Sequence, residues 1–184
     1  MTDPIAIRYA TAADSELLAE IGAQTFFDAF ARDNTPEDMR AYLAASFSPE
    51  KQARELAEPR SVFLIAEIAG RAAGYAHLRQ TPPPACIIGA HPVEIGRLYV
   101  RQEWIGHGVG AALMRACLAH AARQSADTLW LAVWARNPRA IAFYQAWGFV
   151  QVGTQIFQLG NDRQNDLLMQ RPVTASILDQ GELA

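Results

Sequence analysis

Three glycines at alternate positions, Gly106, Gly108 and Gly110, are the part of the sequence that points most directly to chemistry. An apolar run with strand character, residues 98–100, precedes them, and a run with helical periodicity follows. Glycines at this spacing let consecutive backbone N–H groups turn toward one point, because no Cβ blocks the approach. The unpaired N–H groups at the start of the following helix, and the positive end of its dipole, also attract an anion. The segment therefore predicts a strand, a phosphate-binding loop and a helix.

Two common nucleotide-binding loops do not fit this spacing. A Walker loop ends in Gly-Lys-Ser/Thr, whereas Gly108 is followed by Val109 and Gly110. A dinucleotide-binding fingerprint separates its glycines by one and three residues, whereas these glycines alternate. The order of strand, x-x-Gly-x-Gly and helix instead resembles the pyrophosphate loop of the Gcn5-related N-acetyltransferases (GNAT). Ile105 stands where that motif has Arg or Gln, which should matter little because backbone N–H groups hold the pyrophosphate.

A second stretch, N-P-R-A-I-A-F-Y-Q-A-W-G-F from Asn137 to Phe149, resembles the GNAT signature of an Asn, a helix bearing Ala and Tyr, and a closing Gly-Phe. Taken without the resemblance, Asn137 is a helix N-cap and Gly148 is a helix stop. The resemblance implies that acetyl-CoA is the cosubstrate and that no metal is required. It also implies a set of cofactor-binding residues: Leu98, Tyr99, Val100, Gly106, His107, Gly108, Val109, Gly110, Ala111, Asn137, Ala140 and Phe143.

The resemblance also assigns two catalytic roles. Glu94 aligns with the glutamate that is the general base in the histone-type members, acting directly or through water. A primary amine with a pKa of about 10.4 must lose its proton before it attacks, at a cost of about 4 to 5 kcal/mol at pH 7. Tyr144, near the cofactor sulfur by analogy, would protonate the leaving thiolate, since a phenol pKa of about 10 and a thiol pKa of about 8.5 are close. A backbone N–H of residues 98–100 would hold the oxyanion.

A narrower resemblance concerns the acceptor. The segments T-F-F-D-A-F and N-T-P-E-D-M-R-A-Y-L (within residues 25–43), W-L-A-V-W (130–134) and Q-x-D-L-x-M (164–169) are similar to PaiA-type polyamine acetyltransferases. This similarity implies a small-molecule amine substrate such as spermidine or spermine. Gly96 departs from the pattern, because an acidic residue is expected there in the polyamine enzymes.

The charge distribution also favours a cationic acceptor. Residues 14–58 contain ten acidic and four basic side chains, a net charge of −6. In the GNAT family the first helices wall the acceptor side of the cleft, so we expect Asp28 and Glu37 to contribute to cation binding. Two alternatives stay open: an acetyltransferase for peptide N-termini or other small amines, and a non-catalytic acyl-CoA-binding regulatory module, which Gly96 would favour.

Periodicity and capping signals predict the elements that must position these residues. Helices are expected from Thr11 or Asp14, from Thr35-Pro36 and from Ser48-Pro49. Further helices are expected over Gly106 to Arg123 and from Asn137, and strands over 5–8, 61–69, 73–79, 93–100, 128–133, 149–157 and 166–171. The expected fold class is α/β: a single-domain acyl-CoA N-acyltransferase (GNAT) fold over residues 1–172, with helices flanking a twisted mixed β-sheet whose central strands splay. Residues 173–184 are expected to form a mobile tail.

Composition limits the class of protein. The chain has 184 residues, a net charge of −3 and 51% hydrophobic residues, which indicates one globular domain. The small net charge argues against nucleic-acid binding, which needs a basic face. We expect a cytoplasmic protein without membrane contact, because the sequence has neither a signal-peptide pattern nor a run of about 18 apolar residues. Cys86 and Cys117 lack the partners of a zinc site. The oligomeric state stays open, a homodimer included.

Overall fold

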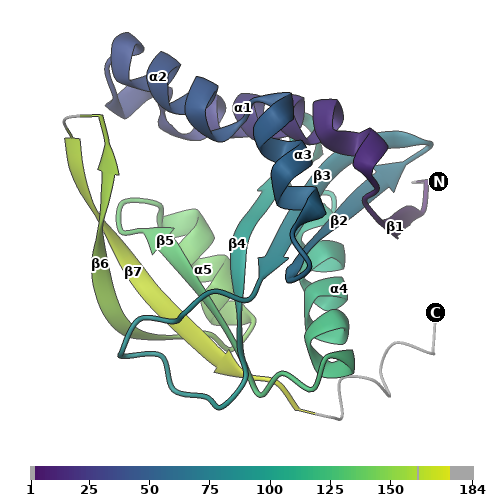
Figure 1. Ribbon diagram of the computed structural model, residues 1–184, viewed down its shortest axis with the longest axis vertical. Helices are drawn as coiled ribbons and strands as arrows, with labels where there is room; N and C mark the ends of the chain where they lie inside the picture. Colours follow the sequence, from purple (N-terminus) through teal and green to yellow (C-terminus); the bar gives the residue numbers. More distant parts are fainter. Residues whose placement is uncertain (1–2, 161, 175–184) are drawn as a thin grey trace.

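The computed structural model describes residues 3–160 and 162–174 of the chain. Within these ranges it contains seven strands, five α-helices and three short 3-10 turns (Figure 1). The strands are β1 (Ile5–Tyr9), β2 (Ser61–Ile68), β3 (Arg71–Arg79), β4 (Pro92–Val100), β5 (Thr128–Trp134), β6 (Val150–Leu159) and β7 (Asp162–Pro172). The helices are α1 (Ser15–Phe30), α2 (Pro36–Ser46), α3 (Pro49–Ala57), α4 (Val109–Arg123) and α5 (Pro138–Ala146). The 3-10 turns are η1 (Ala12–Asp14), η2 (Ala31–Asp33) and η3 (Gln102–Trp104).

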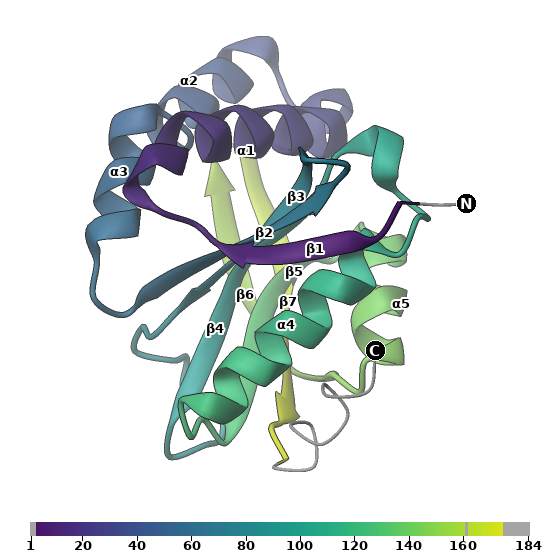
Figure 2. The same ribbon diagram turned by 90° about the vertical axis from the view of Figure 1, so that its right-hand side faces the viewer.

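The described strands form one mixed sheet in the order β1-β2-β3-β4-β5-β7-β6. β4 and β5 are parallel neighbours, and the other neighbouring strands are antiparallel. Helix α4 packs on one face against β1 to β4, whereas α1 and α3 cover the other face and α2 extends toward β6 (Figures 1 and 2). The largest core cluster lies between α4 and the sheet and includes Leu113, Cys117 and Leu131. The predicted mixed sheet flanked by helices is confirmed.

β4 and β5 separate soon after they begin. Residues 92–94 of β4 lie opposite residues 128–130 of β5, and no further pairing joins these two strands in the described part of the chain. The edge of β4 from residue 95 to residue 100 therefore faces a gap, and part of its backbone N–H and C=O groups point into it. A bulge against β3 leaves Gly96 as the extra residue, which adds local twist. The predicted splay of the central strands is confirmed.

Two helix starts in the first third of the chain agree with their capping signals. Thr35 Oγ1 accepts a hydrogen bond from the Asp38 N–H at 3.2 Å at the start of α2. Ser48 Oγ accepts one from the Lys51 N–H at 3.2 Å at the start of α3. In both helices proline occupies the first turn, where a missing N–H costs no hydrogen bond. Short-range signals thus position the helices that wall the site described below.

Helix α4 begins at Val109, so the predicted start at Gly106 is wrong. Gly106 has φ +85° and Gly108 has φ +86°, values in the left-handed region that a right-handed helix excludes. Gly108 is the N-cap of α4, and the first two glycines belong to the loop that leads into the helix. The prediction placed the start too early because hydrophobic periodicity carries no information on the φ angle that a glycine adopts.

The end of the chain is described as far as Thr174. β7 ends at Pro172, and the N–H of Val173 donates to the carbonyl of Asp127 at 2.9 Å. The predicted tail over 173–184 lies, from residue 175 on, outside the described residues. None of the described helices combines the length and apolar character needed to cross a bilayer.

Candidate active site

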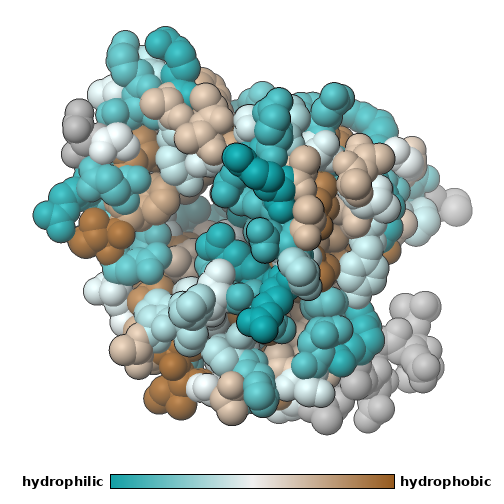
Figure 3. Space-filling view, in the orientation of Figure 1, coloured by the Kyte–Doolittle hydropathy of each residue, from teal (hydrophilic) through white to brown (hydrophobic). Residues whose placement is uncertain are grey.

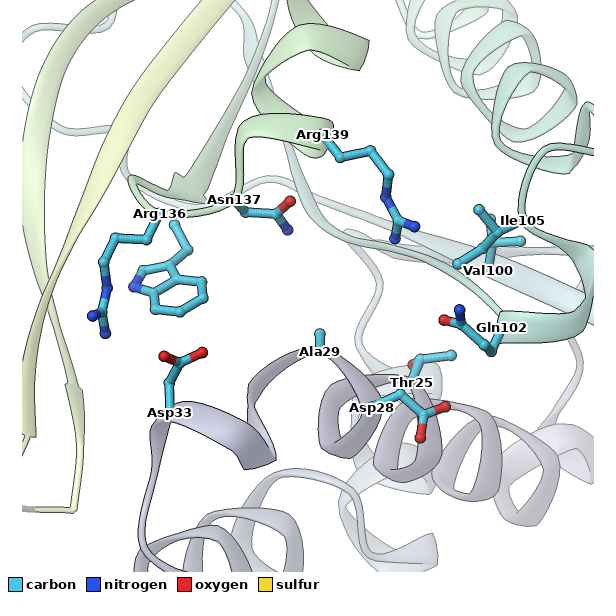
Figure 4. A pocket seen from close by; sticks show the side chains of 11 residues that line it. Thr25, Asp28, Ala29, Asp33, Val100, Gln102, Ile105, Arg136, Asn137 and Arg139 are labelled. Carbon is cyan, nitrogen blue, oxygen red and sulfur yellow. The ribbon is translucent and has the colours of Figure 1, made fainter.

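Two adjoining cavities open where β4 and β5 separate. The outer cavity, of about 350 Å³, lies between α1, the segment after β4 and the start of α5 (Figure 4). The inner cavity, of about 380 Å³, extends beneath α1 and α2 to β6 and β7. The molecular surface is hollowed between these helices and strands (Figure 3). The cavities form one continuous cleft, because they share six lining residues: Thr25, Ala29, Val100, Trp134, Asn137 and Arg139.

The glycine loop lies beside the outer cavity, which Ile105 lines. A Cβ placed on Gly106 would meet no atom within 4 Å, and one on Gly108 would meet the Ile5 side chain at 3.7 Å. Open space therefore lies beside Gly106, and the N–H groups of the first turn of α4 lack carbonyl partners within the helix. A pyrophosphate fits this cradle of free N–H groups and a helix N-terminus.

Arg139 lines both cavities and is a candidate binding residue that the sequence analysis did not name. Its guanidinium extends from α5 toward Val100 and Gln102, across the outer cavity (Figure 4). A cation in the first turn of a helix opposes the helix dipole, so the position is unfavourable unless an anion lies nearby. That conflict was a signal available in the sequence. Asn137 has a structural role at the same place, because its Oδ1 accepts a hydrogen bond from the Ala140 N–H at 3.1 Å.

Tyr144 lines the inner cavity from α5. Its ring packs edge-on against Phe143 and Phe149, with centroids 5.4 and 5.8 Å away. Burial raises the pKa of the Tyr144 phenol above its ordinary value, with a smaller contribution from Cys117. The hydroxyl makes no hydrogen bond to another described residue. The phenol is therefore protonated at neutral pH, and the general-acid role of Tyr144 stays a prediction.

The other predicted cofactor residues divide into two groups. Leu98, Tyr99, Val100, Asn137 and Ala140 line the inner cavity, together with Tyr144 and Glu94. The loop residues 106–111 and Phe143 line neither cavity. Val109 is buried in the core, Phe143 packs beside Gly110, and the exposed His107 lies edge-on to Trp104. For the loop, cofactor contact would thus come from backbone N–H groups at the rim of the cleft.

Glu94 is buried, and both of its carboxylate oxygens accept hydrogen bonds within the protein. Its two carboxylate oxygens accept hydrogen bonds from Arg79 Nε at 2.8 Å and from the second guanidinium nitrogen at 2.7 Å. Thr81 Oγ1 donates a third hydrogen bond at 2.7 Å. The guanidinium lies across Gly96, where a Cβ would stand 3.0 Å from Arg79 Nε. A residue with a Cβ at position 96 would press on this guanidinium, so glycine leaves room for the arginine that pairs with Glu94.

The acidic residues of the first helices do not gather in the inner cavity, contrary to expectation. Asp28 lines the outer cavity, and Glu37 is exposed outside both cavities. Others are neutralised within the fold, since Asp14, Glu20 and Glu55 form ion pairs with arginines. Helices α1 and α2 do wall the cleft, but largely with aromatic side chains instead of carboxylates.

The fold brings together a glycine loop at a helix N-terminus, a gap between parallel strands and a tyrosine that lines the cavity at this gap. The model of the acetyltransferase (GNAT) family matches residues 23–149, which include all three features. This chain belongs to the GNAT family of acetyltransferases. An uncharacterized N-acetyltransferase of Mycobacterium tuberculosis is 36% identical over 158 residues, covering 86% of this GNAT chain and 97% of the relative. The N-alpha-acetyltransferase RimI of the same organism is 31% identical over 155 residues, covering 83% and 82%.

Solved structures agree on the GNAT fold. The PaiA N-acetyltransferase of Thermoplasma acidophilum, crystallised with coenzyme A, superposes with a TM-score of 0.72 and covers 92% of this chain and 99% of its own. At 21% identity this likeness concerns the fold. As a GNAT protein, the chain is an acyl-CoA-dependent N-acetyltransferase, with acetyl-CoA as the donor. Among the described residues, no group of three His, Cys, Asp or Glu side chains is arranged to hold a metal ion.

Proposed function

We propose that this GNAT acetyltransferase transfers the acetyl group of acetyl-CoA directly to a primary amine of a small cationic acceptor of the polyamine class, such as spermidine or spermine. The observation that carries the proposal is the lining of the inner cavity. Around Tyr144 it contains aromatic rings, among them Phe26, Tyr42 and Phe157, and the buried carboxylate of Asp166. Aromatic faces and carboxylates both attract ammonium groups, so the lining suits a cation.

Each part of the cleft has a separate task in this reaction. Acetyl-CoA, when bound, supplies the thioester carbonyl that the amine attacks. Backbone N–H groups on the free edge of β4, residues 95–100, are placed to bind the pantetheine amides and the oxyanion. The glycine loop and Arg139 bind the pyrophosphate. Tyr144 donates its proton to the departing sulfur.

Glu94 stays the predicted general base, although its carboxylate is held by Arg79 and Thr81. Each carboxylate oxygen has two lone pairs, and three hydrogen bonds leave one of the four free. The carboxylate can therefore still take a proton from the ammonium, directly or through water. The ion pair with Arg79 also holds the side chain in one orientation at the floor of the inner cavity.

The Glu94→Gln variant is expected to lose about 10²-fold in kcat/KM for the amine, because a positioned base is removed. The acidic limb of the pH–rate profile should disappear with it. Arg79→Gln is the matched control, since it breaks the same ion pair and keeps the carboxylate. Initial rates over a pH series test both variants. Equal losses in the two variants would mean that the ion pair supports the fold and that Glu94 is not the base.

A panel of acceptors tests the proposed function itself. Thiol release from acetyl-CoA should be faster with spermidine than with butylamine, by about tenfold or more in kcat/KM, which corresponds to about 1.4 kcal/mol of added interaction. Initial-rate measurements at one salt concentration are sufficient. Equal rates with the two amines would rule out the polyamine class and leave only the acetyltransferase activity.

A second candidate acceptor is the α-amino group of a peptide. The observation that favours it is the 31% identity to a mycobacterial N-alpha-acetyltransferase. A short peptide with a free N-terminus, added to the same panel, separates the two candidates. Turnover of the peptide that exceeds the turnover of spermidine would favour this second function.

A further inference from the structure

The inner cavity contains a second carboxylate besides Glu94. Asp166 of β7 lines this cavity and is 8% exposed. It lies opposite Trp134 of β5, and Glu94 lies opposite Trp130 of the same strand. Residues paired across neighbouring strands share a face, and positions two or four apart along a strand do so as well. Glu94 and Asp166 therefore face the same side of the sheet, the side covered by α1 and α2.

Among the described residues, Asp166 is the carboxylate in this cavity without an ion pair, and Arg139, which reaches across the outer cavity, is the cation without one. Glu94 is paired with Arg79, and Arg97 is paired with Glu55 at 2.6 Å. Asp166 has a hydrogen bond with the amide of Gln155 and no ion pair to another described residue. Burial raises the pKa of the Asp166 carboxyl, and the bond with Gln155 lowers it by less. A buried carboxylate without a cation is costly, and a cationic ligand would remove that cost.

The surroundings of Asp166 also suit a cation. Tyr42 of α2 and Phe157 of β6 both line the cavity, and their ring centroids are 5.6 Å apart. Phe26 of α1 stacks on Tyr42 at 4.5 Å and extends the aromatic wall. Aromatic faces attract ammonium groups more strongly where water is excluded. Carboxylate and rings thus form one side of the cavity.

Asp166 lies too far along the sheet from the gap between β4 and β5 to act as the general base. The gap that admits the thioester lies between β4 and β5, and β7 is the next strand beyond β5. Neighbouring strands lie about 4.8 Å apart, so the strand that carries Asp166 is about one strand spacing beyond the β5 edge of the gap. A nitrogen attacking in the gap is therefore beyond direct reach, whereas a second nitrogen on a short alkyl chain is within reach.

We propose that Asp166 binds a second ammonium group of the acceptor, one short alkyl chain away from the nitrogen that is acetylated, and so selects diamines over monoamines. This inference rests on the proposed function, because it assumes an amine acceptor. It assigns Asp166 to substrate specificity, whereas Tyr144 and Glu94 serve the transfer step.

The Asp166→Asn variant tests this role, since asparagine keeps the shape of the side chain and a hydrogen-bonding group for Gln155. The probes are 1,4-diaminobutane and butylamine, which differ in the second nitrogen. The wild type should prefer the diamine by about tenfold or more in kcat/KM, and the variant should lose this preference, because one partner of a buried charge pair is removed. The kcat/KM for butylamine and the KM for acetyl-CoA should stay within about twofold. Glu37→Gln, an exposed carboxylate on α2, is the matched control and should keep the preference.

Calorimetric binding of both amines to the CoA-saturated protein gives a readout that does not need turnover. If the wild type acetylates no amine, the proposed function fails. Diamine binding that depends on Asp166 would still support the role of Asp166 as the binding site of the second ammonium group. This role of Asp166 is overturned if Asp166→Asn keeps the preference for the diamine, or if the variant loses affinity for both amines equally. It is also overturned if the wild type prefers the diamine neither in rate nor in binding.

Discussion

Replacing Tyr144 by phenylalanine is expected to lower kcat by about 10² to 10⁴, the usual range for a positioned proton donor, and to leave the affinity for CoA within a few-fold. The substitution removes the hydroxyl of a residue that lines the inner cavity. It retains the ring that packs against Phe143 and Phe149, so the fold should be kept. Steady-state rates and calorimetric titration with CoA measure the two quantities separately.

The raised pKa of Tyr144 does not prevent this role. Burial favours the neutral form of any acid, and a thiol in the same surroundings is affected in the same direction. The neighbouring core shows the effect, because burial raises the pKa of the Cys117 thiol to about 12. The phenol and a thiol leaving group buried beside it therefore stay close in acidity, and the proton transfer stays near balance.

Tyr9→Phe is the matched control for this experiment. Tyr9 is 49% exposed and bonds to His120 and Arg123, away from both cavities. Its loss should leave kcat and CoA affinity unchanged. If Tyr144→Phe lowers folding stability and CoA affinity together, with kcat unchanged in the folded fraction, Tyr144 is a core aromatic and not the acid.

The second large effect is expected at the glycine loop. Gly108→Val should abolish CoA binding in a calorimetric titration, because φ +86° is strained for a β-branched residue and any relaxation of this φ turns the loop N–H groups away from the pyrophosphate. Circular dichroism should still show a folded protein, because a Cβ at this position meets only Ile5, at an ordinary distance of 3.7 Å. Loss of a pyrophosphate site removes the charged contacts that hold the cofactor.

Gly70→Val separates loss of the site from backbone strain. Gly70 has φ +74° in the turn between β2 and β3, and a Cβ there would meet nothing within 4 Å. Both variants should lose about 1 to 2 kcal/mol of stability from the strained backbone. CoA affinity should fall in Gly108→Val alone. Unchanged CoA affinity in a folded Gly108→Val protein would show that the pyrophosphate does not bind at this loop.

The order of the elements was predictable from short windows of sequence. The caps at Thr35 and Ser48 and the stop at Gly148 depend on residues within one turn of each other, so local chemistry determines them. The glycine loop and the Asn-to-Phe stretch likewise lie within single segments, which is why they indicated the family. The predicted start of α4 at Gly106 was wrong because periodicity does not register the φ that a glycine adopts.

The details of the site depended on tertiary contacts. Arg79 meets Glu94 because antiparallel pairing and a bulge at Gly96 bring the two together. Asp166 faces the cleft because of its pairing with Trp134, and a shift of one residue would turn it to the opposite face. Most acidic residues of the first helices form ion pairs or stay exposed, which a count of charges could not distinguish.

The sequence by itself therefore determined the family and the order of the elements, since each follows from residues close together in the chain. The tertiary structure decided which carboxylate is neutralised and which is left without a cation. The physical reason is that an ion pair between strands depends on their register, and the register is set by all the contacts along the strands together. Arginine partners drawn from distant segments are thus visible only once the chain is folded.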